Sequence, residues 1–182
     1  MVGSSTSLEA ALSATARAID ERMNLLLPKA DGAEHRLLEA MRYSAIGAGK
    51  RLRPLLVLAS SELFGVSRDS ALQVGAAIEC VHCYSLVHDD LPCMDDDDMR
   101  RGKPTVHKAY NEATAVLAGD ALLTFAFDIL AMEATHMDPM VRVQLVQALA
   151  HSSGAQGMVG GQAIDLAAED EEMDLGSITR LQ

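Results

Sequence analysis

The sequence predicts an all-α helical bundle, and three observations support this. Apolar residues recur every three or four positions along most of the chain, which is the spacing of one face of a helix. No segment shows the alternation of apolar and polar residues that is typical of a half-buried strand. The composition is 49% hydrophobic but only 3% aromatic, and the predicted connections are short. We therefore expect residues 1–182 to form one helical domain or the N-terminal part of one.

The first three predicted helices rest on periodicity and on end signals. Apolar residues at helical spacing occupy residues 8–26 and then 37–45. Ser67 can cap a further helix that continues to the first aspartates of the chain. This helix must end near Pro92, because proline cannot lie deep inside a helix.

Two more helices are predicted in the second half of the chain. Residues 114–132 are apolar on nearly all sides, so we expect this helix to be buried. Asp138 followed by Pro139 is typical of a helix start, and it predicts a helix through Leu149. The acidic run at residues 169–174 is interpreted as a solvated helix end or loop.

Charge and composition exclude several classes of protein. The net charge of −11 disfavours nucleic acid as a partner, since phosphate backbones require a basic surface. The uninterrupted apolar runs are too short for a membrane span, and the N-terminus lacks the features of a signal peptide. Cys80 and Cys83 form a C-x2-C without a second pair, so we interpret them as buried side chains of a protein in a reducing compartment. We expect a soluble, cytoplasmic protein.

A dense group of aspartates is the strongest functional signal. Residues 86–105, LVHDDLPCMDDDDMRRGKPT, place six aspartates within residues 89–98 and follow them with Arg100, Arg101 and Lys103. Like charges a few ångströms apart repel by several kcal/mol near a protein surface. Such a segment is costly unless a cation binds to it.

Helical geometry indicates how these carboxylates could act together. On a helix that reaches the first aspartates, His82, Ser85 and Asp89 lie on one face, because seven residues make nearly two turns. The LPCM insertion then breaks the helix and lets Asp95 return to the same opening. The carboxylates of Asp89, Asp90 and Asp95 are hard oxygen ligands that suit Mg²⁺, with Mn²⁺ as an alternative.

Two other interpretations of the aspartates are less favoured. An EF-hand loop beginning at Asp95 would have Arg100 where glycine is needed and Val106 where glutamate is needed. A solvated acidic turn does not explain why Arg100 and Arg101 follow directly. Acids that bind a metal and arginines that bind phosphate are the two halves of a metal–diphosphate site.

A second segment, AIGAGKRLRPLL at residues 45–56, is basic. It can present both side-chain cations and helix N-terminal amides to an anion. It is not a Walker A loop, because Ser44 replaces the first glycine and Arg51 stands where Ser or Thr would bind magnesium. A solvated basic patch is the alternative for this segment alone.

These motifs resemble those of the trans-isoprenyl diphosphate synthases, most closely the bacterial farnesyl diphosphate synthases. The resemblance runs from about residue 34 to the end and rests on GKRLRP, ECVHCYSLVHDDLPCMDDDDMRRGKPT, LAGDALL and GGQAIDL, in the order of the family. It implies an isoprenoid synthase-type helical bundle. It also implies a prenyltransferase that condenses isopentenyl diphosphate with dimethylallyl or geranyl diphosphate, forms farnesyl diphosphate and releases diphosphate.

The resemblance also implies roles for individual residues. The magnesium ligands would be the three carboxylates of Asp89, Asp90 and Asp95, and Arg100 would contact the allylic diphosphate. The isopentenyl diphosphate pocket would be formed by four basic residues: Lys50, Arg53, His82 and Arg101. Gln162 would line the allylic side, and Asp165 is a weaker candidate beside it.

Product length is expected to depend on the helix before Asp89. In this family, a bulky residue five positions upstream of the first aspartate blocks the growing chain, and that residue is Tyr84 here. Val81 and Ser85, with Ile78, lie along approximately one stripe that leads to Asp89. A farnesyl product follows if Tyr84 blocks the stripe, while ordinary packing of Tyr84 between helices is the alternative.

Two departures from the family pattern affect these expectations. Ala48 replaces a more usual glycine, and the sequence stops at Gln182, before the family's Lys-Thr pair and its second aspartate motif. The chain alone is therefore expected to bind metal–diphosphate weakly and not to turn over. The alternatives are a geranyl or geranylgeranyl diphosphate synthase, or a non-catalytic partner subunit of a prenyl synthase. A terpene cyclase is less favoured because it would not need a second diphosphate pocket. The resemblance implies a homodimer.

Overall fold

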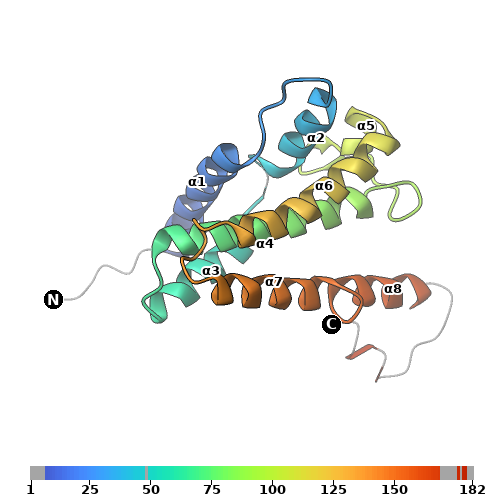
Figure 1. Cartoon of the computed structure of the whole chain (residues 1–182). Coiled ribbons are helices and arrows are strands. Elements are labelled where there is room, and N and C mark those ends of the chain that lie inside the picture. Colours follow the sequence, from blue (N-terminus) through green and yellow to red (C-terminus); the bar gives the residue numbers. More distant parts are fainter. Residues whose placement is uncertain (1–6, 48, 169–175, 177, 180–182) are drawn as a thin grey trace. The chain divides into compact units, whose positions relative to one another are not determined.

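The computed structural model describes residues 7–47, 49–168, 176, 178 and 179, and these residues are mainly helical (Figure 1). The chain divides into two compact units, residues 1–137 and 138–182. The first unit contains α1 (Leu8–Leu26), α2 (His35–Ala45), α3 (Leu52–Leu63), α4 (Arg68–Asp89), β1 (Met99–Arg100), β2 (Lys103–Pro104), α5 (Val106–Ala109) and α6 (Glu112–Ala131). The second contains α7 (Pro139–Ser153) and α8 (Met158–Ala168). The all-α prediction is confirmed.

Helices α4 and α6 form the centre of the first unit, and they lie along one another (Figure 1). Small side chains let the two backbones approach closely. A Cβ atom at Gly119 of α6 would lie 2.1 Å from Nε2 of His88 on α4, so the imidazole occupies the space beside the glycine. The core around this contact consists of fully buried side chains, among them Ile19, Met23, Ala76, Cys80, Leu122, Ala126 and Ile129.

The helix starts predicted from capping residues are confirmed. The Ser67 hydroxyl accepts a hydrogen bond of 3.1 Å from the backbone N–H of Ser70 at the start of α4. Asp138 accepts one of 2.8 Å from the N–H of Met140 at the start of α7. Each bond satisfies a helix N–H group that has no partner within the helix. Helix α4 ends at Asp89, before Pro92, as predicted.

The prediction that the helix over residues 114–132 is buried is only partly confirmed. Helix α6 buries one face against its neighbours, but the side chains of Val116 and Leu117 are 41% and 55% exposed. Helices α4, α2 and α5 contact α6 but leave these two side chains uncovered. Its other side presents apolar surface.

Helices α4 and α6 are also long and apolar enough to cross a bilayer, judged by length and composition alone. The apolar window of α4 is 67% buried within the structure, and that of α6 is 39% buried. Central helices of water-soluble proteins have the same length and composition. This feature therefore does not distinguish a membrane helix from a core helix.

A short β-hairpin, which the sequence did not predict, follows the aspartate segment. Strands β1 and β2 pair antiparallel, with Met99 opposite Pro104. Their turn uses positive φ angles of 53° at Arg101 and 78° at Gly102, the conformation of a tight hairpin turn. Two-residue strands are too short to show alternation in the sequence. The hydroxyl of Tyr43 donates a 2.7 Å hydrogen bond to the carbonyl of Pro104 and ties the hairpin to α2.

Candidate functional site

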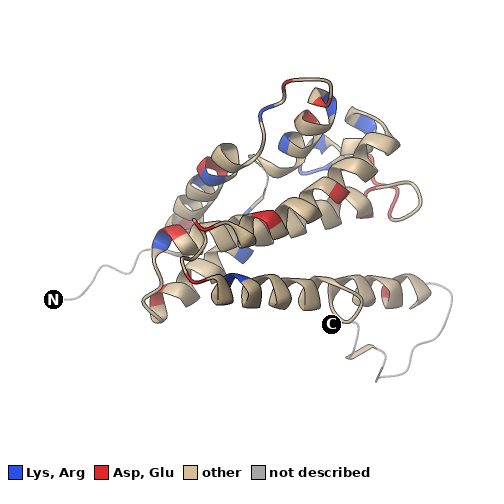
Figure 2. Ribbon diagram, viewed as in Figure 1, with Lys and Arg blue, Asp and Glu red and all other residues tan. Residues whose placement is uncertain are grey.

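The aspartate segment folds back onto the C-terminal end of α4. Asp89 is the last residue of the helix, and the backbone N–H of Asp95 donates a 2.8 Å hydrogen bond to the carbonyl of Asp89. Asp90 and the four LPCM residues after it make the turn between them, as the sequence indicated. In the ribbon of Figure 2, the loop that follows α4 carries acidic residues, coloured red.

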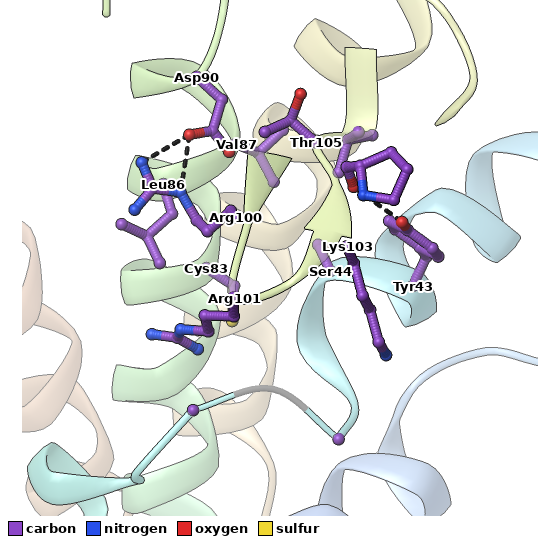
Figure 3. Close-up of a pocket in the computed structure, with 14 residues that line it drawn as sticks. Tyr43, Ser44, Cys83, Leu86, Val87, Asp90, Arg100, Arg101, Lys103 and Thr105 are labelled. Atoms are coloured by element: carbon purple, nitrogen blue, oxygen red, sulfur yellow. Dashed lines mark hydrogen bonds and ion pairs between the residues drawn. The ribbon is translucent and has the colours of Figure 1, made fainter. Parts of the chain in front are cut away.

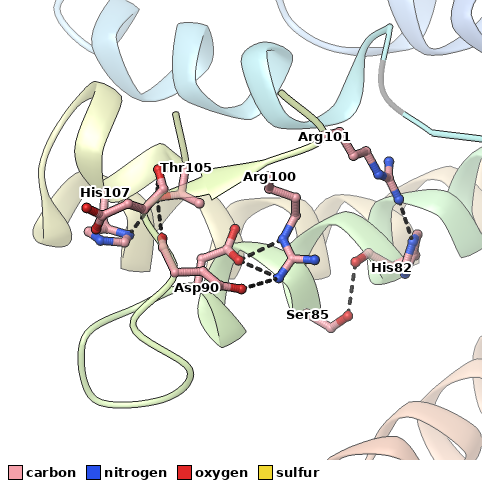
Figure 4. A network of polar contacts seen from close by, with 9 residues as sticks. His82, Ser85, Asp90, Arg100, Arg101, Thr105 and His107 are labelled. Atoms are coloured by element: carbon pink, nitrogen blue, oxygen red, sulfur yellow. Dashed lines mark hydrogen bonds and ion pairs between the residues drawn. The ribbon is translucent and has the colours of Figure 1, made fainter. Parts of the chain in front are cut away.

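Asp90 occupies a different environment from its neighbour. Its side chain is 3% exposed, and Oδ1 accepts hydrogen bonds of 2.7 Å from Nε and 2.6 Å from Nη2 of Arg100 (Figure 4). The hydrogen bond to Asp90 is the largest cause that raises the pKa of Arg100 above its usual range. Asp90 and Arg100 thus neutralise one another in this structure, whereas the sequence assigned them separately to metal and phosphate.

Asp89 has the electrostatics of a cation ligand. Partial burial, followed by the negative charge of Asp95, raises the pKa of the Asp89 carboxyl above its usual value. A cation would relieve both costs. Within the described part of the chain, however, Asp89, Asp90 and Asp95 are gathered at one helix end without forming a coordination-sized group. The three residues that do form one are Asp96, Asp98 and His107.

The four residues predicted to bind isopentenyl diphosphate line one cavity. This cavity has a volume of about 470 Å³, and its lining includes Lys50, Arg53, His82 and Arg101. Three elements supply them: the loop and start of α3, helix α4, and the hairpin turn. Cations from separate parts of the sequence therefore converge on one hollow, which is the arrangement that an anionic ligand needs.

His82 is kept neutral by this surrounding. Partial burial, followed by the positive charges of Arg53 and Arg101, lowers the pKa of His82 from 6.5 to about 4. A ring nitrogen of His82 lies 3.4 Å from a guanidinium nitrogen of Arg101 (Figure 4). The neutral imidazole accepts from Arg101 and orients it toward the cavity.

Gly49 makes the close approach of Arg101 possible. Its φ angle is +91°, which side chains rarely adopt, and a Cβ atom there would lie 2.1 Å from Nη1 of Arg101. Both the positive φ angle and the nearby guanidinium of Arg101 therefore disfavour a side chain at Gly49.

Arg51 and Glu79 also line this cavity, but the Arg51 guanidinium is engaged by partners in the interior. Arg51 is 2% exposed and pairs with Glu79 at 2.7 Å and Asp20 at 2.5 Å, and it also donates to the carbonyl of Ala45 at 2.6 Å. This network joins α1, the end of α2 and α4 beneath the cavity. The sequence analysis did not identify Glu79 as part of the site. Its position, as a single acid inside a mainly apolar stretch of α4, could have indicated a buried partner for a cation.

A smaller, more enclosed cavity of about 240 Å³ lies between α2, α4 and the hairpin (Figure 3). Gly49 and Arg101 line both cavities. The remaining lining combines apolar groups of α4, such as Leu86 and Val87, with the Asp90–Arg100 pair. The Asp90–Arg100 pair therefore lines a cavity that shares two lining residues, Gly49 and Arg101, with the basic cavity.

The residues predicted to set product length lie on two sides of α4. Tyr84 and Val81 are buried, and Ser85 and Ile78 are partly exposed. The Tyr84 ring packs edge-on against His88, with ring centroids 5.7 Å apart. Along the stripe drawn from the sequence, Val81 is buried while Ile78 and Ser85 are partly exposed, and the role of this stripe in product length stays a prediction.

The remaining predicted residues lie in the second unit or outside the description. Gln162 is partly exposed and Asp165 is exposed, both on α8. Because the second unit is described by itself, the structure does not relate them to the cavity. Ala48, the acidic residues 169–174 and the terminal Gln182 lie outside the described residues.

Comparison with known proteins identifies the family. Residues 34–181 match the polyprenyl synthetase family, which is most of the chain. The chain belongs to the polyprenyl synthetase family. Among members of this family, the farnesyl diphosphate synthase of Escherichia coli is 49% identical over 146 residues, which cover 80% of this chain and 49% of that protein. The chain therefore spans about half the length of this polyprenyl synthetase.

Two further polyprenyl synthetases bear on the fold and on the product. The crystal structure of an FPP/GFPP synthase from Zymomonas mobilis is 60% identical with a TM-score of 0.91, covering 93% of this chain and 62% of that chain. A chloroplastic heterodimeric geranylgeranyl pyrophosphate synthase large subunit from Arabidopsis thaliana is 50% identical over 139 residues, 75% of this chain and 37% of that protein. Relatives of similar identity thus carry names with different product lengths.

Proposed function

We propose that the whole protein containing this chain is a prenyltransferase that joins isopentenyl diphosphate to an allylic diphosphate, forms farnesyl diphosphate and releases diphosphate. The observation that carries this proposal is the basic cavity beside the aspartate loop. Lys50, Arg53, His82 and Arg101 converge there from separate elements. Membership of the polyprenyl synthetase family and farnesyl diphosphate synthase relatives support the same reaction.

Asp89, Asp90 and Asp95 would bind a divalent cation if their carboxylates were drawn together, since they do not form a coordination-sized group among the described residues. Asp89 and Asp95 are held together by a backbone hydrogen bond, and the pKa of Asp89 is raised by burial and by Asp95. Oxygen donors of this kind suit Mg²⁺ and also Mn²⁺. Asp90 would join them, although Arg100 holds its Oδ1. A magnesium ion bound there would neutralise negative charge on the allylic diphosphate.

The chain's own residues would bind and orient the two substrates. Lys50, Arg53 and Arg101 would hold isopentenyl diphosphate by charge, with the neutral His82 beside them, and Arg100 would reach the allylic diphosphate. When the allylic carbon–oxygen bond breaks, the diphosphate takes the electron pair, and the isopentenyl double bond attacks the allylic cation. The proton then lost passes to the departed diphosphate. Positioning and electrostatics supply the catalysis, so no side-chain nucleophile is needed. Gln162 would line the allylic side.

A geranylgeranyl product is the second candidate, because a relative with that name is as similar as the farnesyl diphosphate synthases. The buried Tyr84 favours the shorter product. The proposal also includes a cytoplasmic homodimer without nucleic acid partners or membrane spans. The exposed apolar side chains of Val116 and Leu117 on α6 support self-association.

The test is an assay of radiolabelled isopentenyl diphosphate incorporation by the whole protein, with geranyl diphosphate and Mg²⁺. We expect farnesyl diphosphate as the product, and we expect Asp89→Asn to lower kcat/KM by at least about a hundredfold. Asp31→Asn, an exposed aspartate away from the site, serves as the matched control. Near-normal turnover of Asp89→Asn at saturating Mg²⁺ would contradict the metal assignment. A wild-type protein that turns over only with a second synthase would support the partner-subunit alternative.

A further inference from the structure

A further group of metal-ligating side chains combines the aspartate loop with α5. One imidazole nitrogen of His107 and one carboxylate oxygen from each of Asp96 and Asp98 all lie within 4.8 Å of one another. None of these three residues has a role in the proposed prenyl transfer. Asp96 and Asp98 belong to the loop, and His107 belongs to α5.

His107 is the observation that points to a ligand. Its side chain is only 7% exposed, and its Nε2 atom is buried without a hydrogen-bond partner. A buried polar atom without a partner costs free energy, so such atoms are rare and call for an explanation. A metal ion would provide the missing partner.

The hydrogen bonds around His107 define which ring nitrogen can bind a metal. The hydroxyl of Thr105 donates to the carbonyl of Asp97 at 2.8 Å, so its oxygen is left to accept from Nδ1 of His107 at 3.2 Å (Figure 4). The proton of the neutral imidazole then sits on Nδ1, and Nε2 carries the lone pair. Metal-binding histidines are commonly held in this way by a hydrogen bond to the other nitrogen.

Both aspartates remain accessible for coordination. Asp96 and Asp98 are exposed, so water could complete the coordination shell. The carboxylate of Asp98 also forms an ion pair of 2.7 Å with the ammonium group of Lys108, whose side chain is 43% exposed. Because exposed ion pairs contribute little stability, Lys108 would compete only weakly with a divalent metal for this carboxylate.

We propose that Asp96, Asp98 and His107 form a divalent transition-metal site, separate from the carboxylates at the end of α4, which binds Zn²⁺ or Co²⁺ in preference to Mg²⁺. An imidazole nitrogen with two carboxylates suits these metals, whereas Mg²⁺ prefers oxygen ligands alone. The ion would connect the aspartate loop to α5. The site does not depend on the proposed prenyl transfer.

The test is Co²⁺ binding to the chain without any diphosphate, followed by isothermal titration calorimetry and visible absorption in excess Mg²⁺. Excess Mg²⁺ occupies sites that contain only oxygen ligands. We expect one Co²⁺ ion per chain, and we expect Asp96→Asn and Asp98→Asn each to weaken it at least about tenfold, since even outer-shell partners cost about 10- to 100-fold. With Zn²⁺, the Nε2 resonance of His107 should shift in a nitrogen NMR spectrum.

Three variants make the outcome decisive without altering the buried histidine. Asp97→Asn removes the same charge from the same loop and should leave Co²⁺ binding unchanged. Asp89→Asn should also leave it unchanged, and Lys108→Met should tighten it by removing a competitor. The proposal is overturned if Co²⁺ does not bind, if Asp89→Asn abolishes binding while Asp98→Asn does not, or if the His107 resonance is unaffected by Zn²⁺.

Discussion

Arg51 is the largest of the fully buried side chains, and its charge is balanced inside the protein. Burial disfavours the charged form, but hydrogen bonds to Glu79 and Asp20 outweigh this and raise the pKa of Arg51 above its usual range. Buried ion pairs often contribute little net stability, yet removing one partner is costly because the other charge is left uncompensated. The segment from Lys50 to Arg53 at the start of α3 therefore depends on acids from two other helices.

We predict that Glu79→Gln lowers the free energy of unfolding by about 3 kcal/mol, because it leaves the Arg51 guanidinium without its most buried partner. Urea denaturation followed by circular dichroism measures this change. Asp69→Asn is the matched control, since Asp69 pairs with Arg22 at 2.7 Å but its side chain is 84% exposed. The control should cost at most about 1 kcal/mol. Equal losses in the two variants would contradict the structural role of Glu79.

His82 is predicted to report the arrival of an anion. Free His82 should titrate near pH 4, and diphosphate should raise its pKa because the anion offsets the charges of Arg53 and Arg101. Proton NMR of the histidine resonances with and without diphosphate measures this shift. The exposed His35 serves as the control, and its resonances should not move when diphosphate is added. A pKa of His82 that is insensitive to diphosphate would place the anion elsewhere.

The same shift gives a pH dependence of stability. The folded pKa of about 4 lies below the value of 6.5 for an unperturbed histidine. Between pH 4 and pH 6.5, His82 is protonated to a greater extent in the unfolded chain than in the folded chain. The contribution of His82 to stability therefore falls as the pH is lowered from 6.5 to about 4.

At the scale of elements, α4 connects the proposed binding of substrate with the proposed control of product length. It carries His82 in the basic cavity, Tyr84 in the interior and Asp89 at its end. Because a helix rises 1.5 Å per residue, the five positions from Tyr84 to Asp89 span about 7.5 Å along the axis. A side chain at Tyr84 could therefore limit a chain that grows from the end of α4.

We predict that Tyr84→Ala in the whole protein shifts the products toward longer prenyl diphosphates, because it removes a buried ring beside the helix. Chromatography of the dephosphorylated products measures their length. Phe64→Ala, which removes an aromatic ring that is 83% exposed, is the control and should leave the products unchanged. An unchanged product distribution in Tyr84→Ala would mean that this ring only packs against His88.

At the scale of the whole molecule, the exposed apolar side of α6 supports the proposed homodimer. We predict that Leu117→Glu weakens self-association of the whole protein, since it places a charge where apolar contact is expected. Sedimentation velocity over a range of protein concentrations measures the effect. Leu63→Glu, at an 83% exposed position of α3, is the control. A wild-type protein that is monomeric at all concentrations would contradict the dimer.

Most of the helical architecture could be predicted from the sequence because periodicity and caps are local signals. Ser67 and Asp138 each predicted a helix start, and the hydrogen bonds of both are present. The hairpin was missed because its strands are only two residues long. The burial of α6 was predicted only in part, because apolar composition does not reveal how many neighbours a helix has.

The site was predictable in its composition but not in its pairing. The four residues assigned to one diphosphate do line one cavity, although His82 is neutral there. Two ion pairs were not predicted: Arg100 with Asp90, and Arg51 with Glu79. Both depend on side-chain directions, which sequence spacing alone does not determine. His107 was missed for a similar reason, since only the fold shows that its Nε2 lacks a partner.

The hydrogen bond between the N–H of Asp95 and the carbonyl of Asp89 closes the backbone into a ring. The length of this turn determines which residue makes the closing hydrogen bond. Adding or deleting one residue of LPCM would therefore bring a different side chain to that position. The number of residues in this turn is therefore as constrained as their chemistry, and a length variant would disturb the site even with every aspartate retained.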